Sequence, residues 1–187
     1  MSFTLKADEK HLLLRTARES IRSKLAAAHP DYPKPSEKLR TPCGAFVTLR
    51  AGEELRGCIG HIAAHQALFD AVAELARSSA FADPRFPPVS IDELEEIEIE
   101  ISVLTPLVRI QSGKDVVVGT HGVYLESGGR SGVLLPQVPV EQGWDRKQFL
   151  HHLCLKAGLS PGCLSLPGTR LFVFEAIIFS EKEFTGA

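Results

Sequence analysis

The sequence predicts an α+β fold in which mainly antiparallel sheets are flanked by helices. Two observations support this prediction: the strand-like segments come in pairs joined by short turns, and helical segments interrupt the pairs instead of alternating with single strands. Hydrophobic residues make up 44% of the 187 residues and charged residues 24%, which is ordinary globular usage. A chain of this length suits one large domain or two small, intimately packed ones.

Three segments have the apolar spacing of helices that face a core. The first is residues 8–27, where Asp8 is the expected N-cap and apolar side chains recur every fourth residue. The second is residues 65–80. The third is residues 145–159, in which Asp145 is expected to cap the first turn.

Six segments have the composition of strands. They are residues 45–51, 55–62, 95–104, 122–127, 131–137 and 170–179. The first two, and likewise the fourth and fifth, are joined by short glycine-containing turns and are predicted to form hairpins. The third alternates apolar residues with glutamate, which is typical of a strand with one buried face. The last is apolar on both faces and is predicted to be one central strand.

The overall charge argues against two classes of partner. The chain has 21 lysines and arginines against 23 acidic residues, so the formal net charge is −2 and provides no long-range attraction for nucleic acid or an acidic membrane.

The first ten residues contain charges where a signal peptide needs an apolar core, and no stretch approaches the length of a membrane span. We therefore expect a cytoplasmic protein.

The cysteines and the absence of familiar motifs limit the cofactors. Cys43, Cys58, Cys154 and Cys163 include no C-x-x-C pair, so a zinc ribbon, a thioredoxin motif and an iron–sulfur cysteine triplet lack their ligands. In a cytosol all four are expected to stay thiols. Phosphate-binding loops and metal-protease motifs are absent as well. We expect no bound metal, flavin or nicotinamide.

The stretch "LRGCIG", residues 55–60, is the first candidate site. In an extended strand Arg56, Cys58 and Gly60 share one face, and a neighbouring arginine favours the reactive thiolate of a cysteine. Gly57 and Gly60 interrupt an apolar strand, which marks the close approach of another backbone or a ligand. The alternative is structural: Cys58 packs as a small apolar residue and Arg56 pairs with an acidic strand.

Two further features have a chemical and a structural interpretation. His121 lies between glycines in "GTHGVY" and could transfer protons, although a turn histidine hydrogen-bonded to the backbone is favoured. Glu96, Glu98 and Glu100 project from one face of their strand. They could bind a hard cation. The favoured alternative is that they lie on a solvated face of the sheet and pair with lysine or arginine side chains on a neighbouring strand.

The order of several sequence blocks resembles one family. "LRGCIGHI", "ADPRFPPV", "IEISVLTP", "GTHGVYLE", "LLPQVPVEQGWD" and "FLHHLCLKAGL" follow one another as in the AMMECR domain family, whose bacterial and archaeal members are called AmmeMemoRadiSam system protein A. The resemblance runs from about Gly44 to the final strand. It implies that residues 1–187 form one AMMECR-type domain, in which a larger and a smaller subdomain pack together and "LRGCIG" faces the cleft between them.

The resemblance implies no particular reaction, and two functions remain open. The first is an accessory or substrate-binding component of a pathway shared with a Memo-like protein and a radical S-adenosylmethionine protein. The second is a thiol-dependent enzyme with Cys58 as the nucleophile. In that enzyme Arg56 and Arg85 would bind a small anionic substrate, and His121 would transfer protons.

Overall fold

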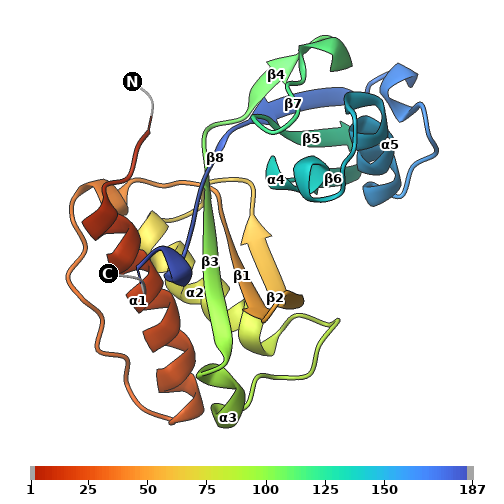
Figure 1. Ribbon diagram of the computed structural model, residues 1–187. Coiled ribbons are helices and arrows are strands. Elements are labelled where there is room, and N and C mark those ends of the chain that lie inside the picture. Colours follow the sequence, from red (N-terminus) through yellow and green to blue (C-terminus); the bar gives the residue numbers. More distant parts are fainter. Residues whose placement is uncertain (1–2, 185–187) are drawn as a thin grey trace. The chain divides into compact units, whose positions relative to one another are not determined.

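The computed structural model describes residues 3–184, and the chain forms two compact units (Figure 1). Unit 1 is the larger and comprises the chain up to Leu104 together with the part from Ile177 onward. Unit 2 comprises Thr105–Ala176. Each unit has its own four-stranded sheet and its own apolar core. The chain is α+β, as the sequence predicts.

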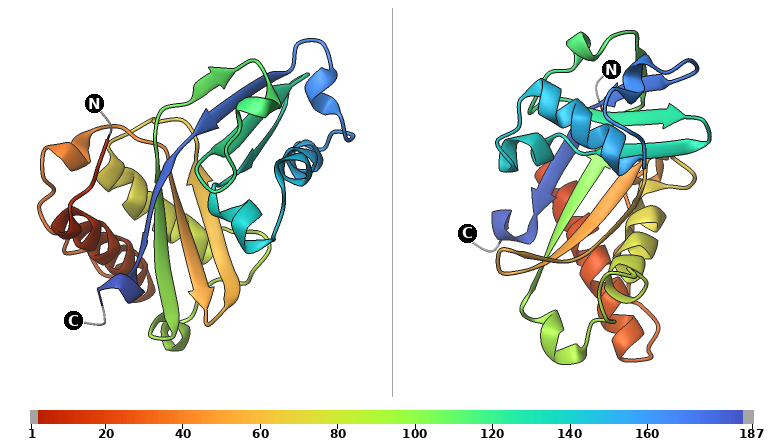
Figure 2. Two further views of the ribbon diagram at one scale, coloured as in Figure 1. Left: turned by 45° about the horizontal axis from the view of Figure 1, so that its top comes forward. Right: turned by 90° about the vertical axis from the view of Figure 1, so that its right-hand side faces the viewer.

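Unit 1 is a four-stranded sheet with two long helices on one of its faces (Figure 2). Its elements are α1 (Ala7–Leu25), β1 (Ala45–Ala51), β2 (Glu54–His61), α2 (Leu68–Phe81), α3 (Ile91–Leu94), β3 (Ile97–Leu104) and β8 (Ala176–Ser180), with short 3-10 helices at Lys38–Arg40 and Glu181–Glu183. The strand order is β2-β1-β3-β8. Val47, Leu49, Ile99 and Ile101 point toward α1 and α2 and are fully buried. Alternation therefore turns their neighbours on β1 and β3 to the opposite face.

The first helix begins two residues earlier than the predicted N-cap implies. Its N-cap is Lys6 and not Asp8, and the side chain of Glu9 accepts a hydrogen bond from the Lys6 amide at 2.9 Å. A carboxylate three residues into a helix can satisfy the N-cap amide in this way, so the first turn closes without Asp8 as the cap.

A partly buried ion pair joins three parts of unit 1 at the start of β3. Arg18 on α1 donates to the Ile97 carbonyl oxygen at 2.6 Å, and Glu181 accepts from the Ile99 amide at 2.9 Å. The two side chains also bond to each other, with Arg18 Nη2 2.6 Å from Glu181 Oε2. Arg18 also donates to the Leu94 carbonyl oxygen at 2.7 Å. Side chains thus bond to backbone groups of β3 in the way that a further strand would.

Unit 2 has a second antiparallel sheet with one helix packed on it. Its elements are β4 (Val108–Ile110), β5 (Gly122–Ser127), β6 (Arg130–Leu134), α4 (Gln137–Glu141), α5 (Arg146–Lys156) and β7 (Arg170–Phe174), with 3-10 helices at Gly113–Asp115 and Cys163–Ser165. The strand order is β4-β7-β5-β6, and α5 packs against β5 and β6. Asp145 caps α5 as predicted, accepting from the Gln148 amide at 2.8 Å.

The final apolar segment is two strands and not the single central strand that its composition predicts. It is interrupted at Glu175, whose amide and carbonyl both bond to Thr105. The first half is β7, inside the sheet of unit 2, and the second half is β8, at the edge of the sheet of unit 1. Each half is apolar because each packs in a different core, and composition alone does not show that division.

The prediction that all four cysteines remain thiols is wrong for two of them. Cys154 and Cys163 form a disulfide, with their Cα atoms 5.8 Å apart, whereas Cys43 and Cys58 take no part in it. The chain turns back after α5 through Gly158 and Gly162, both with positive φ. This return brings two buried side chains to the spacing that a disulfide requires.

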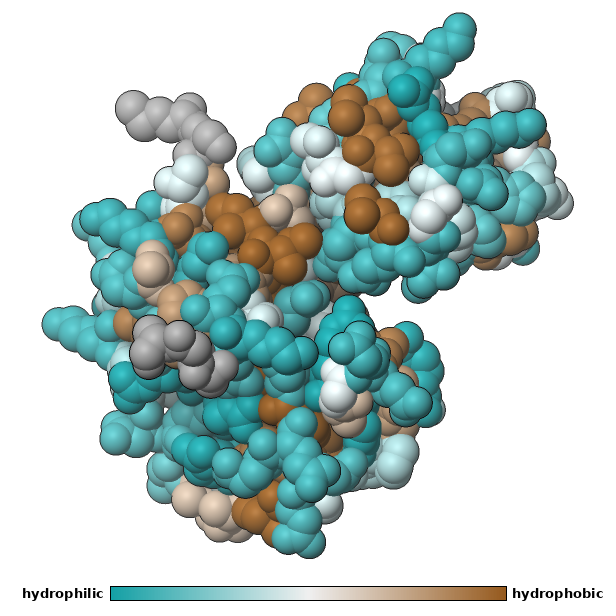
Figure 3. All heavy atoms as spheres, viewed as in Figure 1, coloured by the Kyte–Doolittle hydropathy of each residue, from teal (hydrophilic) through white to brown (hydrophobic). Residues whose placement is uncertain are grey.

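Hydrophilic residues cover most of the surface that is visible in Figure 3, with smaller apolar patches between them. Among residues 3–184, none of the helices combines the length and the apolar composition needed to cross a lipid bilayer.

Candidate functional site

The face of the unit 1 sheet that is turned away from α1 and α2 carries the thiol of "LRGCIG". Cys58 on β2 lies opposite Thr48 on β1, and Thr48 lies opposite Glu100 on β3. The Thr48 hydroxyl donates to Cys58 Sγ at 3.3 Å. A hydroxyl donor of this kind stabilises a thiolate relative to a thiol. We call these three residues, Cys58, Thr48 and Glu100, the thiol row.

A β-bulge removes Arg56 from the simple alternation of β2. Leu49 pairs with Gly57, but the next residue of β1, Arg50, pairs with Leu55, so Arg56 has no partner in the register. Cys58 and Gly60 do share a face, as the sequence predicts. The shift at Arg56 is the kind of local irregularity that a strict two-residue period cannot anticipate.

Gly57 is required because α2 approaches the sheet very closely. The Ser79 hydroxyl on α2 accepts from the Ile59 amide at 2.9 Å and donates to the Val47 carbonyl oxygen at 2.8 Å, so it bridges β2 and β1. A Cβ atom at Gly57 would overlap the backbone carbonyl oxygen of Ser79. The glycine therefore allows the approach of a backbone, one of the two explanations that the sequence left open.

Gly60 makes room for an aromatic ring from the neighbouring strand. It lies opposite Phe46 on β1, and a Cβ atom at Gly60 would overlap that ring. Protein atoms thus occupy the space next to both glycines of the motif, and this packing explains both residues without a ligand.

The outer edge of β2 is bonded to the loop that follows α2. The amide of Cys58 donates to Asp83 Oδ2 at 2.9 Å, and Arg85 Nη2 donates to the Cys58 carbonyl oxygen at 3.2 Å. Arg85 also forms an ion pair with Asp83, at 2.7 Å between Nη2 and Oδ2. These hydrogen bonds hold the pKa of Asp83 far below its ordinary value, even though burial of its side chain opposes the charge.

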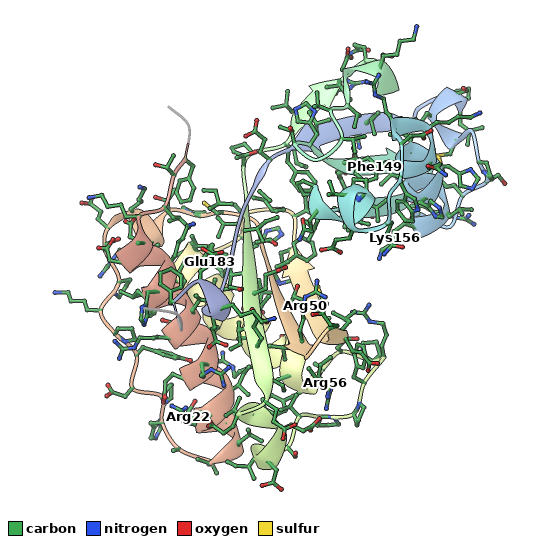
Figure 4. All side chains as sticks on the ribbon, viewed as in Figure 1. Arg22, Arg50, Arg56, Phe149, Lys156 and Glu183 are labelled. Carbon is green, nitrogen blue, oxygen red and sulfur yellow. A yellow bond between two sulfur atoms is a disulfide. The ribbon has the colours of Figure 1, made fainter. Side chains whose placement is uncertain are left out.

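Arg56 is bound to a carboxylate of α3. Its Nε and Nη2 atoms donate to the two carboxylate oxygens of Glu93 at 2.9 and 3.3 Å (Figure 4 labels Arg56). The ring of Phe86 lies beneath the guanidinium groups of both Arg56 and Arg85, with its centroid 6.0 and 5.4 Å from their Cζ atoms. Within residues 3–184, the buried Nη1 of Arg56 has no hydrogen-bond partner. Each predicted anion-binding arginine thus already has a carboxylate partner.

The Arg56–Glu93 pair gives the first testable prediction. Its hydrogen bonds lower the pKa of Glu93 from 4.5 to about 2. A carboxylate whose pKa is depressed on folding stabilises the protein above the unfolded value and loses that contribution as the pH falls from 4.5 toward 2. We expect the free energy of unfolding to fall more steeply across this range in the wild type than in Glu93→Gln, measured by urea unfolding at a series of pH values.

Glu95→Gln is the matched control for this measurement. Glu95 lies two residues further on, is 78% exposed and forms a long ion pair of 3.8 Å with Arg22. Exposed pairs contribute little to stability, so Glu95→Gln should retain the wild-type slope. Equal slopes for the wild type and Glu93→Gln would contradict the assignment of the low pKa to this pair.

One glutamate of the acidic run at β3, Glu98, lies beside basic residues on neighbouring segments, as the structural interpretation of the sequence predicts. Glu98 lies opposite Arg50 on β1 and forms an ion pair with Lys182 at 2.6 Å. Burial opposes the charge of Glu98, but hydrogen bonds from Lys182 and Ser180 outweigh it and lower the pKa of Glu98. Across the described part of the chain, no three His, Cys, Asp or Glu side chains are grouped as metal ligands are.

His121 belongs to unit 2 and is held in a turn. Its Nδ1 accepts from the Val117 amide at 3.2 Å, and its own amide donates to the Val117 carbonyl oxygen at 2.9 Å. Gly119, with a φ of 83°, forms the bend between them. This is the backbone-bonded turn histidine that the sequence favoured over a catalytic one. Cys58, by contrast, is a residue of unit 1.

Three residues of the site were not identified from the sequence. Thr48 looks like any outward residue of a strand, and its role depends on register with β2. Ser79 falls on the apolar stripe of α2, where a single small polar residue at a core position is the one signal that could have revealed it. Glu93 lies in a run of acidic residues. Its pairing with Arg56 depends on the path of the loop between α2 and α3.

Comparisons with known proteins agree on one family. The family model described as AMMECR1 matches residues 14–179. The protein MK0488 of Methanopyrus kandleri is 44% identical over 193 residues, covering 98% of this chain and 93% of that protein. The protein MJ0810 of Methanocaldococcus jannaschii is 41% identical over 190 residues. The crystal structure of the protein PH0010 from Pyrococcus horikoshii has a TM-score of 0.88 and 39% identity, covering 95% of this chain and 94% of that one.

Proposed function

Because the chain belongs to the AMMECR1 family, we propose that it is an accessory, substrate-binding component of a pathway that includes a Memo-like protein and a radical S-adenosylmethionine protein. In this proposal the substrate contacts unit 1 at the thiol row of Cys58, Thr48 and Glu100. The reaction itself is carried out by the partner proteins.

One observation supports a binding role more than an independent catalytic one: the polar groups around "LRGCIG" are used to hold unit 1 together. Asp83 and Arg85 bond the edge of β2, and Glu93 neutralises Arg56. The Thr48 hydroxyl, which hydrogen-bonds to the Cys58 thiol, does not titrate near neutral pH and therefore cannot itself serve as a general base. Chemistry supplied by another protein fits this arrangement.

The partner proteins can be tested for in the cell of origin. Tagged wild-type protein, cross-linked in cells and purified, should carry the Memo-like and the radical S-adenosylmethionine proteins, identified by mass spectrometry. Cys58→Ser should recover the same proteins, because the substitution changes one atom of one side chain. Metabolites extracted from the two preparations should differ, with the bound small molecule reduced in Cys58→Ser. Repeated absence of both partner proteins from the cross-linked wild-type sample would overturn the proposal.

A thiol-dependent enzyme is the second candidate, favoured by the hydrogen bond from Thr48 to Cys58 Sγ. A nucleophilic cysteine needs its thiolate stabilised, and a hydroxyl donor provides part of that stabilisation. This function predicts a covalent adduct on the Cys58 peptide when protein from the cell of origin is analysed by intact-mass and peptide mass spectrometry. Thr48→Val should reduce the adduct, and an unmodified Cys58 under turnover conditions would exclude this function.

A further inference from the structure

We propose that Asp83 and Arg85 have opposite electrostatic effects on the ionisation of the Cys58 thiol: Arg85 favours the thiolate, and Asp83 favours the thiol. Both are positioning residues, since they bond to the backbone of Cys58. The proposal rests on the proposed role of Cys58 in the site. It assigns to Arg85 the charge effect that the sequence attributes to Arg56.

The geometry fixes both charges next to Cys58. Asp83 Oδ2 lies 2.9 Å from the Cys58 amide nitrogen, and Arg85 Nη2 lies 3.2 Å from the Cys58 carbonyl oxygen. The Asp83 side chain is only 2% exposed, so its charge is poorly screened, whereas that of Arg85 is 50% exposed. Hydrogen bonds from Arg85 to Asp83 hold the two side chains together beside Cys58 on β2.

Arg85 and a thiolate at Cys58 attract each other. The pKa of Arg85 is raised, chiefly by its hydrogen bond to Asp83, although burial opposes this; the charges of Asp83 and of a Cys58 thiolate raise it further. Such an interaction is mutual, so the guanidinium must in turn stabilise the thiolate. Arg85 differs from Arg56 in that its Nη2 bonds to Cys58 itself, at the carbonyl oxygen, whereas the Nε and Nη2 atoms of Arg56 bond to Glu93.

Other charged groups around Cys58 come from the neighbouring strands and are the same in every variant considered below. Glu100 on β3 is the far member of the thiol row, and Arg50 is the next outward residue on β1 after Thr48. On the opposite face, α2 contributes Ser79, which carries no charge. Differences between variants at residues 83 and 85 therefore report on the Asp83–Arg85 pair.

The rate of alkylation of Cys58 by iodoacetamide, measured against pH in the isolated protein, tests the proposal. The thiolate sulfur forms a bond to the methylene carbon of the reagent, iodide leaves with the bonding electrons, and the thiol proton has already passed to the buffer. The rate therefore follows the thiolate fraction, and its midpoint gives the thiol pKa. Peptide mapping separates Cys58 from Cys43, the other cysteine outside the Cys154–Cys163 disulfide.

The expected shifts have opposite signs. Arg85→Gln should raise the pKa of Cys58 by about 0.5 to 1 unit, because the stabilising cation is lost. Arg85→Lys should restore a value near that of the wild type, because it retains the charge. Asp83→Asn should lower the pKa by a similar amount, because it leaves Arg85 without its counter-charge.

Cys43 is the internal control for folding. Burial raises the pKa of Cys43, so its rate should stay low in every variant that remains folded and should increase if unit 1 opens. If Asp83→Asn opens unit 1 in this way, the comparison of Arg85→Gln with Arg85→Lys is sufficient to test the proposal. An unchanged pKa in folded Arg85→Gln, or a glutamine and a lysine variant with the same shift, would overturn the proposal. Because the assay contains no partner protein, that result would leave the proposed accessory role standing.

Discussion

Replacing Gly57 with alanine is expected to destabilise unit 1 by about 3 kcal/mol, the upper part of the usual cost of overpacking a core. The added methyl group would overlap the carbonyl oxygen of Ser79, which belongs to the backbone of α2 and cannot rotate away. Relief requires α2 to move, and this movement breaks the bridge that Ser79 makes between β1 and β2. Urea unfolding followed by circular dichroism measures the loss.

Two further variants separate the steric cost from other effects. Gly52→Ala adds the same methyl group at a turn with a φ of 61°, where no described residue beyond the two chain neighbours has an atom within 4 Å, so it should cost only the roughly 1 kcal/mol of a strained backbone. Gly60→Ala overlaps mainly the Phe46 side chain, so Phe46→Ala in the same chain should recover part of its stability. A Gly57→Ala protein as stable as Gly52→Ala would contradict the close approach of α2.

Reducing the Cys154–Cys163 disulfide is expected to destabilise unit 2 by about 2 to 4 kcal/mol and to lower Tm by about 5 to 15 °C. The bond closes a loop between α5 and the segment that leads into β7, and both sulfur-bearing side chains are buried in the core of unit 2. Without the bond the unfolded chain gains conformational freedom that the folded chain does not. Thermal unfolding with and without a phosphine reductant measures this difference.

The double variant Cys154→Ser/Cys163→Ser should lose at least as much stability as the reduced wild type, since it also buries two hydroxyl groups. Cys43→Ser is the control, because Cys43 is free in the structure and its variant should keep its response to reductant. If the reductant leaves the Tm of the wild type unchanged, the two residues pack as thiols, as the sequence analysis expected.

The helices and hairpins could be predicted from the sequence because each depends on a local pattern. The spacing of apolar residues in α1, α2 and α5, and the short turns between β1 and β2 and between β5 and β6, are visible without knowledge of their neighbours. The division of the last apolar segment at Glu175 was not visible. It depends on which core each half joins, and that is decided by contacts with distant parts of the chain.

The placement of Cys58 and Gly60 on one strand face could be predicted from the sequence, whereas the contacts within the candidate site could not. The face shared by Cys58 and Gly60 follows from strand alternation. The partners of Arg56 do not, because a bulge and a proline-rich loop bring Glu93 and Phe86 to it. The hydrogen bond from the Cys58 amide to Asp83 spans 25 residues of sequence, a separation at which no periodic pattern carries information.

The side chains bonded to the backbone of the unit 1 sheet also restrict how another protein can bind to it. Extended peptides often bind by adding a strand to a sheet edge, and they need free amide and carbonyl groups there. At Cys58 both groups are already taken by Asp83 and Arg85, and at the start of β3 the ion pair of Arg18 and Glu181 occupies equivalent positions. β-augmentation is therefore blocked at these positions, and a partner protein that approaches them must recognise side chains. The same hydrogen bonds protect these stretches from edge-to-edge aggregation with a second copy of the chain.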